Sequence, residues 1–518
     1  MDNKPNCIIR LAVPLLLAAF LPAACSLYSH TNIEAGDNQR PIGENDAISS
    51  SAELASLNIP WNLEPDCLKK VRRLEDRKKC EADGNDGNFV AMSISGGGSR
   101  SAVFSAQVMF ELQRYGVLQQ VDMISSVSGG SYTAAFYALS CDDPAVCPET
   151  VEGPDRFLWT EEEVFPMLQK NFKGRWIANL FWPDNMIRYW FTAYDRTDIM
   201  AETLSDNLFD NSMTGNEGFR FQDLNPQRPH LIINATNNTR DDFKPLSPTP
   251  EKLSSCGYKQ GVPPGCHADL MGLNFTFTKE NFSCVCSNLD RFLVAEAVTA
   301  SAAFPGGFPY VTLADCQYGT PGDCDGDQYI HLFDGGASDN LGLLAVNKWL
   351  KNGNVATNGN KNPDKAVILV DGSAMRTGIS TRERNPRRGF DYIIDSNLFD
   401  AFDTLMSQQK QDLMAQTKKS LAKADDFIFI EMNNEAQVEK NWFGWDIVRK
   451  VPTDLKIEDN DAACLRQAAR KLVDHRMEIW RTSHPGGSDF LHVAAKPSPG
   501  KPLPECKAEP SPVRMAKK

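Results

Sequence analysis

The sequence predicts an α/β fold with a central, mostly parallel sheet, and three transitions from strand to loop carry this prediction. Residues 89–94 alternate as a strand does, and they run into three glycines followed by a helical stretch. Residues 121–124 form a short apolar run typical of a buried strand, and a helix of small residues follows. Residues 329–334 end a third strand at an aspartate, which places an acid at the edge of the sheet where ligands bind.

The second transition has the strand–turn–helix order of a nucleophile elbow. Its residues 126–130 follow the pattern G-x-S-x-G, except that Ser126 takes the place of the first glycine. Ser128 would then lie at the tip of a sharp turn, with its hydroxyl exposed beside the positive end of the following helix. Considered alone, the stretch is equally compatible with an ordinary turn capped by Ser128.

The first transition contains Gly96, Gly97 and Gly98, with Arg100 two positions later. Consecutive glycines let backbone N–H groups point into one cavity, which suits a phosphate or the oxyanion of an acyl-transfer intermediate. The stretch fits neither the P-loop pattern nor the dinucleotide fingerprint. Gly116 is expected to end the helix that follows.

The three loops together resemble a known family. Gly-Gly-Gly-x-Arg at residues 96–100, Ser-x-Ser-x-Gly at 126–130 and Asp-Gly-Gly at 334–336 resemble the motifs of patatin-like acyl hydrolases and the related cytosolic phospholipase A enzymes. Further similar segments, in the family's order, are residues 228–236, 300–309 and 339–342. The resemblance covers roughly residues 88–475, and it implies a three-layer α/β/α fold.

This resemblance also implies a site and a reaction. Ser128 would be the nucleophile and Asp334 its base, with no histidine, and the backbone N–H groups of Gly97 and Gly98 would form the oxyanion hole. Arg100 would support the glycine loop or a lipid phosphate. The other supporting residues are Gly96, Gly130, Gly335 and Gly336. The implied substrates are fatty-acyl esters, phospholipids first among them, and the implied chemistry needs neither a metal nor a cofactor.

Two other functions remain open at this stage. An α/β-hydrolase triad would pair Ser128 with Asp334 or Asp371 and with one of three histidines. These histidines are His475, His484 and His492. A non-catalytic surface lipoprotein could instead keep the fold for binding, although all three motifs are intact. Asp-Gly at 334–335 is also a common turn pair when taken alone.

The N-terminus predicts export. Residues 1–24 contain an apolar run that is too short to span a bilayer and is typical of a signal peptide. Cys25 follows two alanines, as in a bacterial lipoprotein cleavage site, although Pro22 stands where leucine is usual. We therefore expect a lipoprotein anchored in the periplasm or outer membrane through Cys25, with simple secretion as the alternative.

The chain of 518 residues has a net charge of −13 and no long basic tract, which argues against nucleic-acid binding. Twelve of its 14 cysteines remain once Cys7 and Cys25 are set aside, and an even number in an exported chain favours disulfides. The neighbouring cysteines are Cys67/Cys80, Cys141/Cys147, Cys256/Cys266, Cys284/Cys286 and Cys316/Cys324. A zinc site is a weaker interpretation, because no C-x-x-C pair occurs. Residues 323–327 have acidic spacing, but a disulfide-tied turn fits them better than a calcium loop does.

The predicted organisation has five parts. After the signal peptide come a polar tether at 25–60, a small extension at 61–87, a hydrolase domain at 88–480 with an insertion at about 141–227, and a C-terminal tail at 481–518. The tail is expected to be loose after Lys496, apart from whatever Cys506 pairs with. A late helix toward Trp480 is expected to begin with Thr453 or Asp454 as its N-cap. Within the insertion, the aromatic stretch from Trp176 to Tyr194 predicts either core helices or an element that meets the membrane interface.

Overall fold

The computed structural model describes residues 88–142, 157–192, 194–209, 218–239, 274–285, 287–305, 307–314, 329–351, 364–373, 409–432, 441–484 and 491–508. The predicted signal peptide, Cys25, the tether, the N-terminal extension and residues 323–327 lie outside these ranges. Each of the five neighbouring cysteine pairs also has at least one member outside them. No helix within the described ranges has both the length and the apolar character needed to cross a bilayer.

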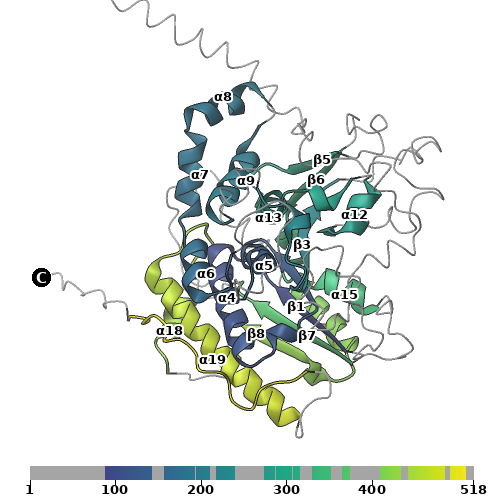
Figure 1. Cartoon of the computed structure of the whole chain (residues 1–518), viewed down its shortest axis with the longest axis vertical. Helices are drawn as coiled ribbons and strands as arrows, with labels where there is room; N and C mark the ends of the chain where they lie inside the picture. Colours follow the sequence, from purple (N-terminus) through teal and green to yellow (C-terminus); the bar gives the residue numbers. More distant parts are fainter. Residues whose placement is uncertain are drawn as a thin grey trace, which may run out of the picture.

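A single mixed sheet forms the centre of the described structure (Figure 1). Its strands are β1 (Asn88–Ile94), β2 (Met123–Val127), β3 (His230–Asn237), β4 (Asn274–Phe277), β5 (Val311–Ala314), β6 (Tyr329–Asp334), β7 (Asp364–Asp371) and β8 (Phe427–Glu431). They follow the order β5-β6-β3-β2-β1-β7-β8, with β4 paired to β3. The run β3-β2-β1-β7-β8 is parallel, whereas β4 and β6 pair antiparallel with β3, and β5 pairs antiparallel with β6. The mostly parallel sheet is confirmed.

Helices cover both faces of this sheet. They are α4 (Gly98–Arg114), α5 (Gly129–Leu139), α6 (Glu161–Leu168), α7 (Phe172–Leu180), α8 (Pro183–Phe191), α9 (Arg196–Asn207), α12 (Lys279–Cys284), α13 (Val294–Ala302), α14 (Gly336–Asp339), α15 (Leu343–Lys351), α18 (Gly444–Val448) and α19 (Asp459–Ser483). Residues 409–419 are also helical. As predicted, Gly116 follows the end of α4 with a left-handed φ of 73°.

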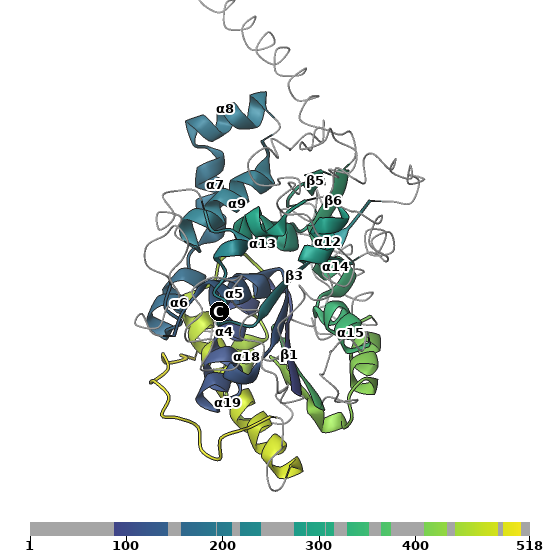
Figure 2. The ribbon, with the colours of Figure 1, turned by 45° about the vertical axis from the view of Figure 1, so that its right-hand side comes forward.

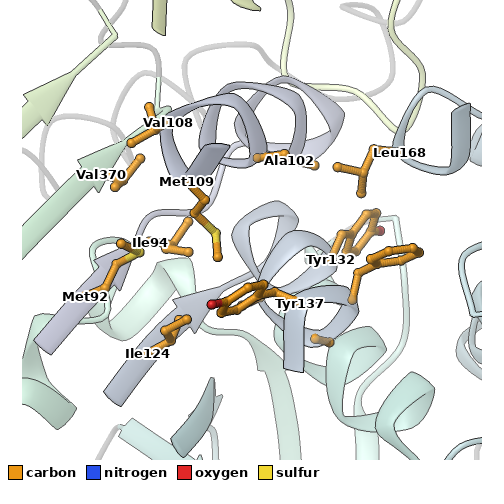
Figure 3. Close-up of a cluster of buried hydrophobic side chains, with 14 of the residues drawn as sticks. Met92, Ile94, Ala102, Val108, Met109, Ile124, Tyr132, Tyr137, Leu168 and Val370 are labelled. Carbon is orange, nitrogen blue, oxygen red and sulfur yellow. The ribbon is translucent and has the colours of Figure 1, made fainter. Parts of the chain in front are cut away.

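The side chains of β1 show how the three layers form. Met92 and Ile94 belong to a buried cluster with α4, α5 and α19, part of which is shown in Figure 3. Phe89 and Ala91, which alternate with them, belong to a second cluster with α15. Figure 2 shows α15 on the opposite side of the sheet from α4, α5 and α19. Because both faces are buried, the strand is apolar at nearly every position, as is usual for a parallel sheet.

The C-terminal part differs from the prediction in two respects. Helix α19 begins at Asp459 with Glu458 as its N-cap, rather than at Thr453 or Asp454. The earlier start fails because the backbone carbonyl of Asp454 accepts a hydrogen bond from the N–H of Ser99 at 2.8 Å, which ties this segment to the glycine loop. The tail after Lys496, expected to be loose apart from the partner of Cys506, packs on α19: Cys506 forms a disulfide with Cys464, and Arg470 Nη1 donates to the carbonyl of Lys501 at 3.1 Å.

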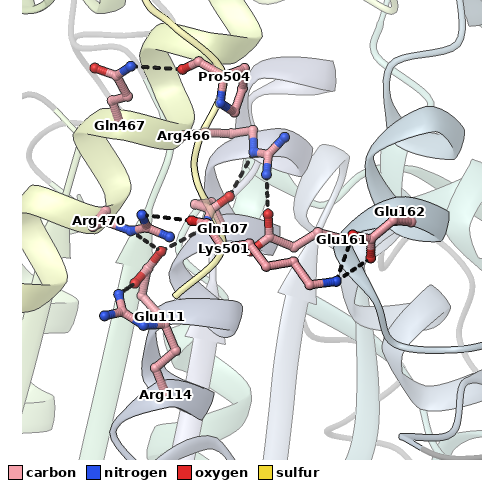
Figure 4. A network of polar contacts seen from close by, with 10 residues as sticks. All are labelled: Gln107, Glu111, Arg114, Glu161, Glu162, Arg466, Gln467, Arg470, Lys501 and Pro504. Atoms are coloured by element: carbon pink, nitrogen blue, oxygen red, sulfur yellow. Dashed lines mark hydrogen bonds and ion pairs between the residues drawn. The ribbon is translucent and has the colours of Figure 1, made fainter. Parts of the chain in front are cut away.

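A polar network fixes α4, α6, α19 and the tail against one another (Figure 4). The carboxylate of Glu111 is fully buried, and it accepts hydrogen bonds from Gln107 Nε2 and Arg470 Nε, each at 2.7 Å. Arg466 Nε donates to Gln107 Oε1 at 2.7 Å, and Lys501 of the tail pairs with Glu162 of α6. Such a buried charge requires this many partners, because burying it unpaired would cost several kcal/mol.

Candidate active site

The register of three strands brings Ser128 and Asp334 together. Val127, the last residue of β2, pairs with Asn234 of β3, while Asp334, the last residue of β6, pairs with the next residue, Ala235. The two strands therefore end beside each other on β3, although their final residues are far apart in the sequence. The Ser128 hydroxyl donates a hydrogen bond to Asp334 Oδ2 at 3.1 Å.

Ser128 occupies a strained turn. Its φ of 49° and ψ of −123° make it the sole residue other than glycine with a positive φ in the described part of the chain. Such a backbone conformation costs on the order of 1–3 kcal/mol, so surrounding contacts must hold it. Ser301 Oγ supplies one, because it accepts a hydrogen bond from the N–H of Ser128 at 2.8 Å. The same hydroxyl donates to the carbonyl of Asn234 at 2.6 Å, which anchors the turn to β3.

Glycines allow the elbow to lie directly against the strand and loop beside it. A Cβ on Gly129 would lie 2.1 Å from the carbonyl oxygen of Gly98, and one on Gly130 would lie 2.6 Å from that of Ser95. Neither position can therefore accept a side chain. Ser126, which replaces the usual glycine, is accommodated because its hydroxyl accepts a hydrogen bond from Ser131 Oγ at 3.0 Å.

The glycine loop lies beside Ser128. Gly97 and Gly98 have φ values of 144° and 60°, and both line a cavity that also contains Ser128. Within the described residues, their backbone N–H groups have no hydrogen-bond partner. Gly96, by contrast, donates its N–H to the carbonyl of Asn340 at 3.0 Å, which fixes the start of the loop.

Arg100 is buried and holds backbone together. Its Nε donates to the carbonyl of Gly372 at 3.0 Å, and its Nη1 donates to that of Val451 at 2.7 Å. These contacts join the glycine loop to the end of β7 and to the segment before α19. The geometry thus fits support of the loop, which is one of the two roles that the resemblance implied.

The environment of Asp334 sets its acidity. The N–H of Gly336 donates to Oδ1 at 2.7 Å, and a Cβ on Gly335 would lie 2.4 Å from the carbonyl of Asn234. Burial raises the pKa of Asp334 from 3.8 to about 6, although the hydrogen bonds from Gly336 and Ser128 act in the opposite direction. A carboxyl with this pKa is ionised at neutral pH and is a stronger base than an exposed aspartate.

The cavity has a volume of about 700 Å³. Ser128, Asp334 and the glycine loop form one part of its wall, and Ala302, Phe304, Pro305 and Phe308 form an apolar part. Among the described residues, no group of three or more His, Cys, Asp or Glu side chains is arranged to hold a metal ion. The arrangement combines a hydroxyl, a buried base, two free N–H groups and an apolar wall, which suits acyl transfer from an apolar ester.

A family model described as patatin-like phospholipase matches residues 92–346. These residues form a patatin-like phospholipase domain. The match to this family supports a lipid acyl hydrolase activity for the domain. None of the curated proteins compared with the sequence matches it.

Two solved structures are among those similar to this chain. VipD from Legionella pneumophila has a TM-score of 0.32 and 12% identity, over 76% of this chain and 67% of that chain. Human GIVD cytosolic phospholipase A2 has a TM-score of 0.39 and 11% identity, over 85% of this chain and 64% of that chain. This chain thus spans about two thirds of the length of each.

None of the histidines in the described ranges lines the cavity. His484 lies beside Asp426, directly before β8, with 3.6 Å between its Nε2 and Asp426 Oδ1. His492 contacts the residues that precede β2, and His475 lies within α19. His484 and His492 are therefore at the edge where the parallel strands begin, whereas Ser128 follows the end of β2.

Asp371, the other acid considered for a triad, has different partners. It ends β7, where it is ion-paired with Lys410 and accepts a hydrogen bond from the N–H of Ser373 at 2.9 Å. Lys410 also contacts Glu431 of β8 at 3.2 Å. This cluster ties the ends of two strands together, and it leaves Asp334 as the carboxylate that contacts Ser128.

Three features of the site were not found from the sequence. Ser301 falls in a segment that resembles the family, but nothing in its composition marks it as the partner of the Ser128 N–H. Tyr132 follows Ser128 by one helical turn and lines the cavity. Residues 451–455 line the cavity opposite the glycine loop, yet they lie more than 300 positions later in the chain. No local pattern in the sequence signals such a contact.

Proposed function

We propose that the protein is a serine acyl hydrolase that cleaves fatty-acyl esters of membrane lipids through a Ser128–Asp334 dyad and an acyl-enzyme. The observation that carries this proposal is the 3.1 Å hydrogen bond from the Ser128 hydroxyl to Asp334. It occurs in a cavity that Gly97 and Gly98 also line, and within the described residues their backbone N–H groups have no hydrogen-bond partner.

In the first step, Asp334 takes the proton of the Ser128 hydroxyl while Oγ attacks the ester carbonyl carbon. The carbonyl oxygen becomes an oxyanion, and the N–H groups of Gly97 and Gly98 donate hydrogen bonds to it. Collapse of this intermediate breaks the ester bond. The leaving alcohol receives the proton from Asp334, and the acyl group remains on Ser128.

In the second step, water replaces the alcohol. Asp334 takes a proton from this water, whose oxygen attacks the acyl carbon, and the same oxyanion hole is used again. The fatty acid leaves, and the proton held by Asp334 returns to Ser128. Asp334 therefore serves as base and as acid in turn, which a pKa near 6 permits at neutral pH.

The surroundings of the cavity support a lipid substrate at a membrane surface. Phe308 lines the cavity and packs against Trp176 of α7, with 5.0 Å between ring centroids. From there, α7 and α8 extend away from the sheet as an arm, with α8 at its outer end (Figures 1 and 2). Phe181, Trp182 and Phe191 on this arm are 66%, 64% and 68% exposed. Exposed aromatics gathered on one arm favour a membrane interface.

The aromatic stretch does not act as one unit, however. Trp176 is half-buried and donates from Nε1 to the carbonyl of Arg196 at 3.1 Å. Tyr194 is buried beneath the guanidinium of Arg188. We assign these two to the packing of the arm, and the exposed residues of α8 and the α7–α8 turn to contact with lipid.

The hydrolysis of p-nitrophenyl acyl esters by the purified protein tests the function. We expect release of p-nitrophenol by the wild type, no release by Ser128→Ala or Asp334→Asn, and full release by His484→Ala and His492→Ala. A histidine variant that loses activity while Asp334→Asn keeps it would replace the dyad with a triad. A folded wild type inactive on esters of every chain length would favour a non-catalytic surface lipoprotein.

We also propose that the chain is exported and anchored through Cys25, on the strength of its signal-like N-terminus. Expressed in a bacterium that processes lipoproteins, the wild type should partition with membranes, and Cys25→Ala should be released or remain unprocessed. Wild-type protein that is soluble in the cytoplasm with free thiols would contradict this assignment.

A further inference from the structure

The hydroxyl of Tyr132 is a polar group without a partner in the described structure. Tyr132 lies on α5, its side chain is fully buried, and its hydroxyl makes no hydrogen bond. Its ring packs edge-on against Phe172, with 5.6 Å between centroids, within the apolar cluster shown in Figure 3. Phenylalanine would fill such a place without the unfavourable burial of an unpaired hydroxyl. Packing alone therefore does not explain why a tyrosine occupies this position.

The position of Tyr132 at the cavity offers an explanation. Tyr132 lines it together with Ser128 and Asp334, and it follows Ser128 by about one turn of helix. The charge of Asp334 acts on the phenol and, after burial, is the second cause that raises the pKa of Tyr132. The phenol consequently keeps its proton at neutral pH and can donate a hydrogen bond. Asp334 lines the same cavity.

Resting on the function proposed above, we propose that the Tyr132 hydroxyl donates a hydrogen bond to the leaving oxygen of the ester. The leaving oxygen gains negative charge as its bond to the acyl carbon breaks, before it receives the proton from Asp334. A donor at this point stabilises the transition state more than the bound ester. Tyr132 itself transfers no proton, so the atoms and charges of the two steps are unchanged.

The inference predicts a dependence on the leaving group. An alkyl ester has a poor leaving group and needs the donor, whereas p-nitrophenolate is stable without one. Tyr132→Phe should therefore lower kcat for alkyl esters by about 100-fold, the usual effect of removing one donor to a developing charge. For p-nitrophenyl esters of the same acyl chain, kcat should change by less than about threefold, and KM should change little for either ester.

Tyr137→Phe is the matched control. Tyr137 is another buried tyrosine of α5, but it packs under the guanidinium of Arg228 and does not line the cavity. It should leave both rates unchanged for folded protein. Tyr132→Phe should melt at the same temperature as the wild type or higher, because it removes an unpaired buried hydroxyl.

Steady-state kinetics on the two ester classes, with melting curves for all three proteins, decide the matter. Equal loss on both esters together with a lower melting temperature would show a structural role for the Tyr132 hydroxyl and overturn the inference. Unchanged kinetics on both esters would overturn it as well. A wild type inactive on both esters would instead reject the proposed hydrolase, which keeps the two failures distinguishable.

Discussion

The Ser128 centre and the α7–α8 arm differ in how their side chains are held. In the centre, Ser128, Ser301 and Asp334 are buried, and each is hydrogen-bonded to a residue of another element. In the arm, large apolar side chains of the α7–α8 turn and of α8 face solvent, and α8 buries none of its residues. The centre is fixed by the register of the sheet, whereas the arm carries apolar surface that the fold does not use.

This difference suggests a division of labour. Chemistry needs atoms held in place, so strain at Ser128 is tolerated where β3 and α13 support it. Reaching an insoluble substrate instead needs apolar area that is free in the isolated protein. The chain carries a net charge of −13, so attraction to anionic lipid cannot by itself bring the cavity to a bilayer. Substitutions in the two regions should therefore affect different measurements.

The largest effect is expected in the centre. Ser128→Ala and Asp334→Asn should each lower kcat for a soluble ester by about 10⁴-fold or more, because the two residues act as a unit. Each variant should remain folded, as judged by circular dichroism and a cooperative melting curve. Residual activity within tenfold of the wild type in either variant would mean that the centre lies elsewhere.

A smaller effect tests how the elbow is held. Ser301→Ala removes the acceptor of the Ser128 N–H, and a buried N–H left unpaired costs about 1–3 kcal/mol. If the unpaired N–H lets the Ser128 hydroxyl move from its position, kcat should drop about 10- to 100-fold with little change in KM. Ser105→Ala is the control, since Ser105 is equally buried but bonds only within α4. Equal kinetics for both variants would remove Ser301 from its positioning role.

The pKa of Asp334 predicts opposite pH trends for activity and stability. Activity requires the carboxylate, so kcat/KM should rise with pH through a midpoint near 6. Because the folded-state pKa is raised above the unfolded value of 3.8, the folded state binds more protons between these values. The stability that this group contributes is therefore fully present below 3.8, and it is lost as the pH rises through 6.

Asp334→Asn should accordingly be more stable than the wild type at pH 8, by about 3 kcal/mol for a pKa shift of roughly two units. The difference should shrink toward zero as the pH falls below 3.8 toward 3, where the wild-type carboxyl is mostly protonated in both states. Chemical denaturation at the two pH values measures it. A variant less stable than the wild type at pH 8 would indicate that the buried charge is not the dominant cost.

The smallest effect is expected in the arm, and on one substrate form alone. Trp182→Ala and Phe191→Ala should leave the melting temperature and the turnover of a soluble ester unchanged. Hydrolysis of lipid in vesicles should fall about tenfold, because each exposed ring that enters the bilayer contributes roughly 1.5 kcal/mol or more. Trp176→Ala is the contrast, since it removes packing on Phe308 and should lower the melting temperature. Equal losses on both substrates for Trp182→Ala would place that residue in the core.

The sequence predicted the fold and the three loops well because each is a local pattern. Alternation in β1, the glycines at 96–98 and the turn at Ser128 depend on neighbouring residues, so short-range chemistry reveals them. The family and the mostly parallel sheet are confirmed. The catalytic roles of Ser128 and Asp334, the domain boundaries and the anchor at Cys25 stay predictions.

Other features of the structure could not be predicted from local sequence patterns, because they depend on contacts between distant segments. The segment before α19 was expected to be helical, yet the Ser99 N–H and Arg100 bind its carbonyls at Asp454 and Val451. The tail after Lys496 was expected to be loose apart from the partner of Cys506, and that partner, Cys464, is not revealed by composition alone. Exposure within the aromatic stretch likewise depends on which side of α7 and α8 meets the body of the protein.

Labelling with a fluorophosphonate probe tests the central claim most directly, because the probe bonds to a serine only where a base activates its hydroxyl. Peptide mapping by mass spectrometry then locates the adduct, and its rate of formation reports the activation. We predict a single adduct on Ser128 in the wild type, with formation slowed by orders of magnitude in Asp334→Asn and unchanged in His484→Ala. An adduct on a different serine, or labelling of Ser128 that proceeds at the wild-type rate in Asp334→Asn, would contradict the Ser128–Asp334 dyad.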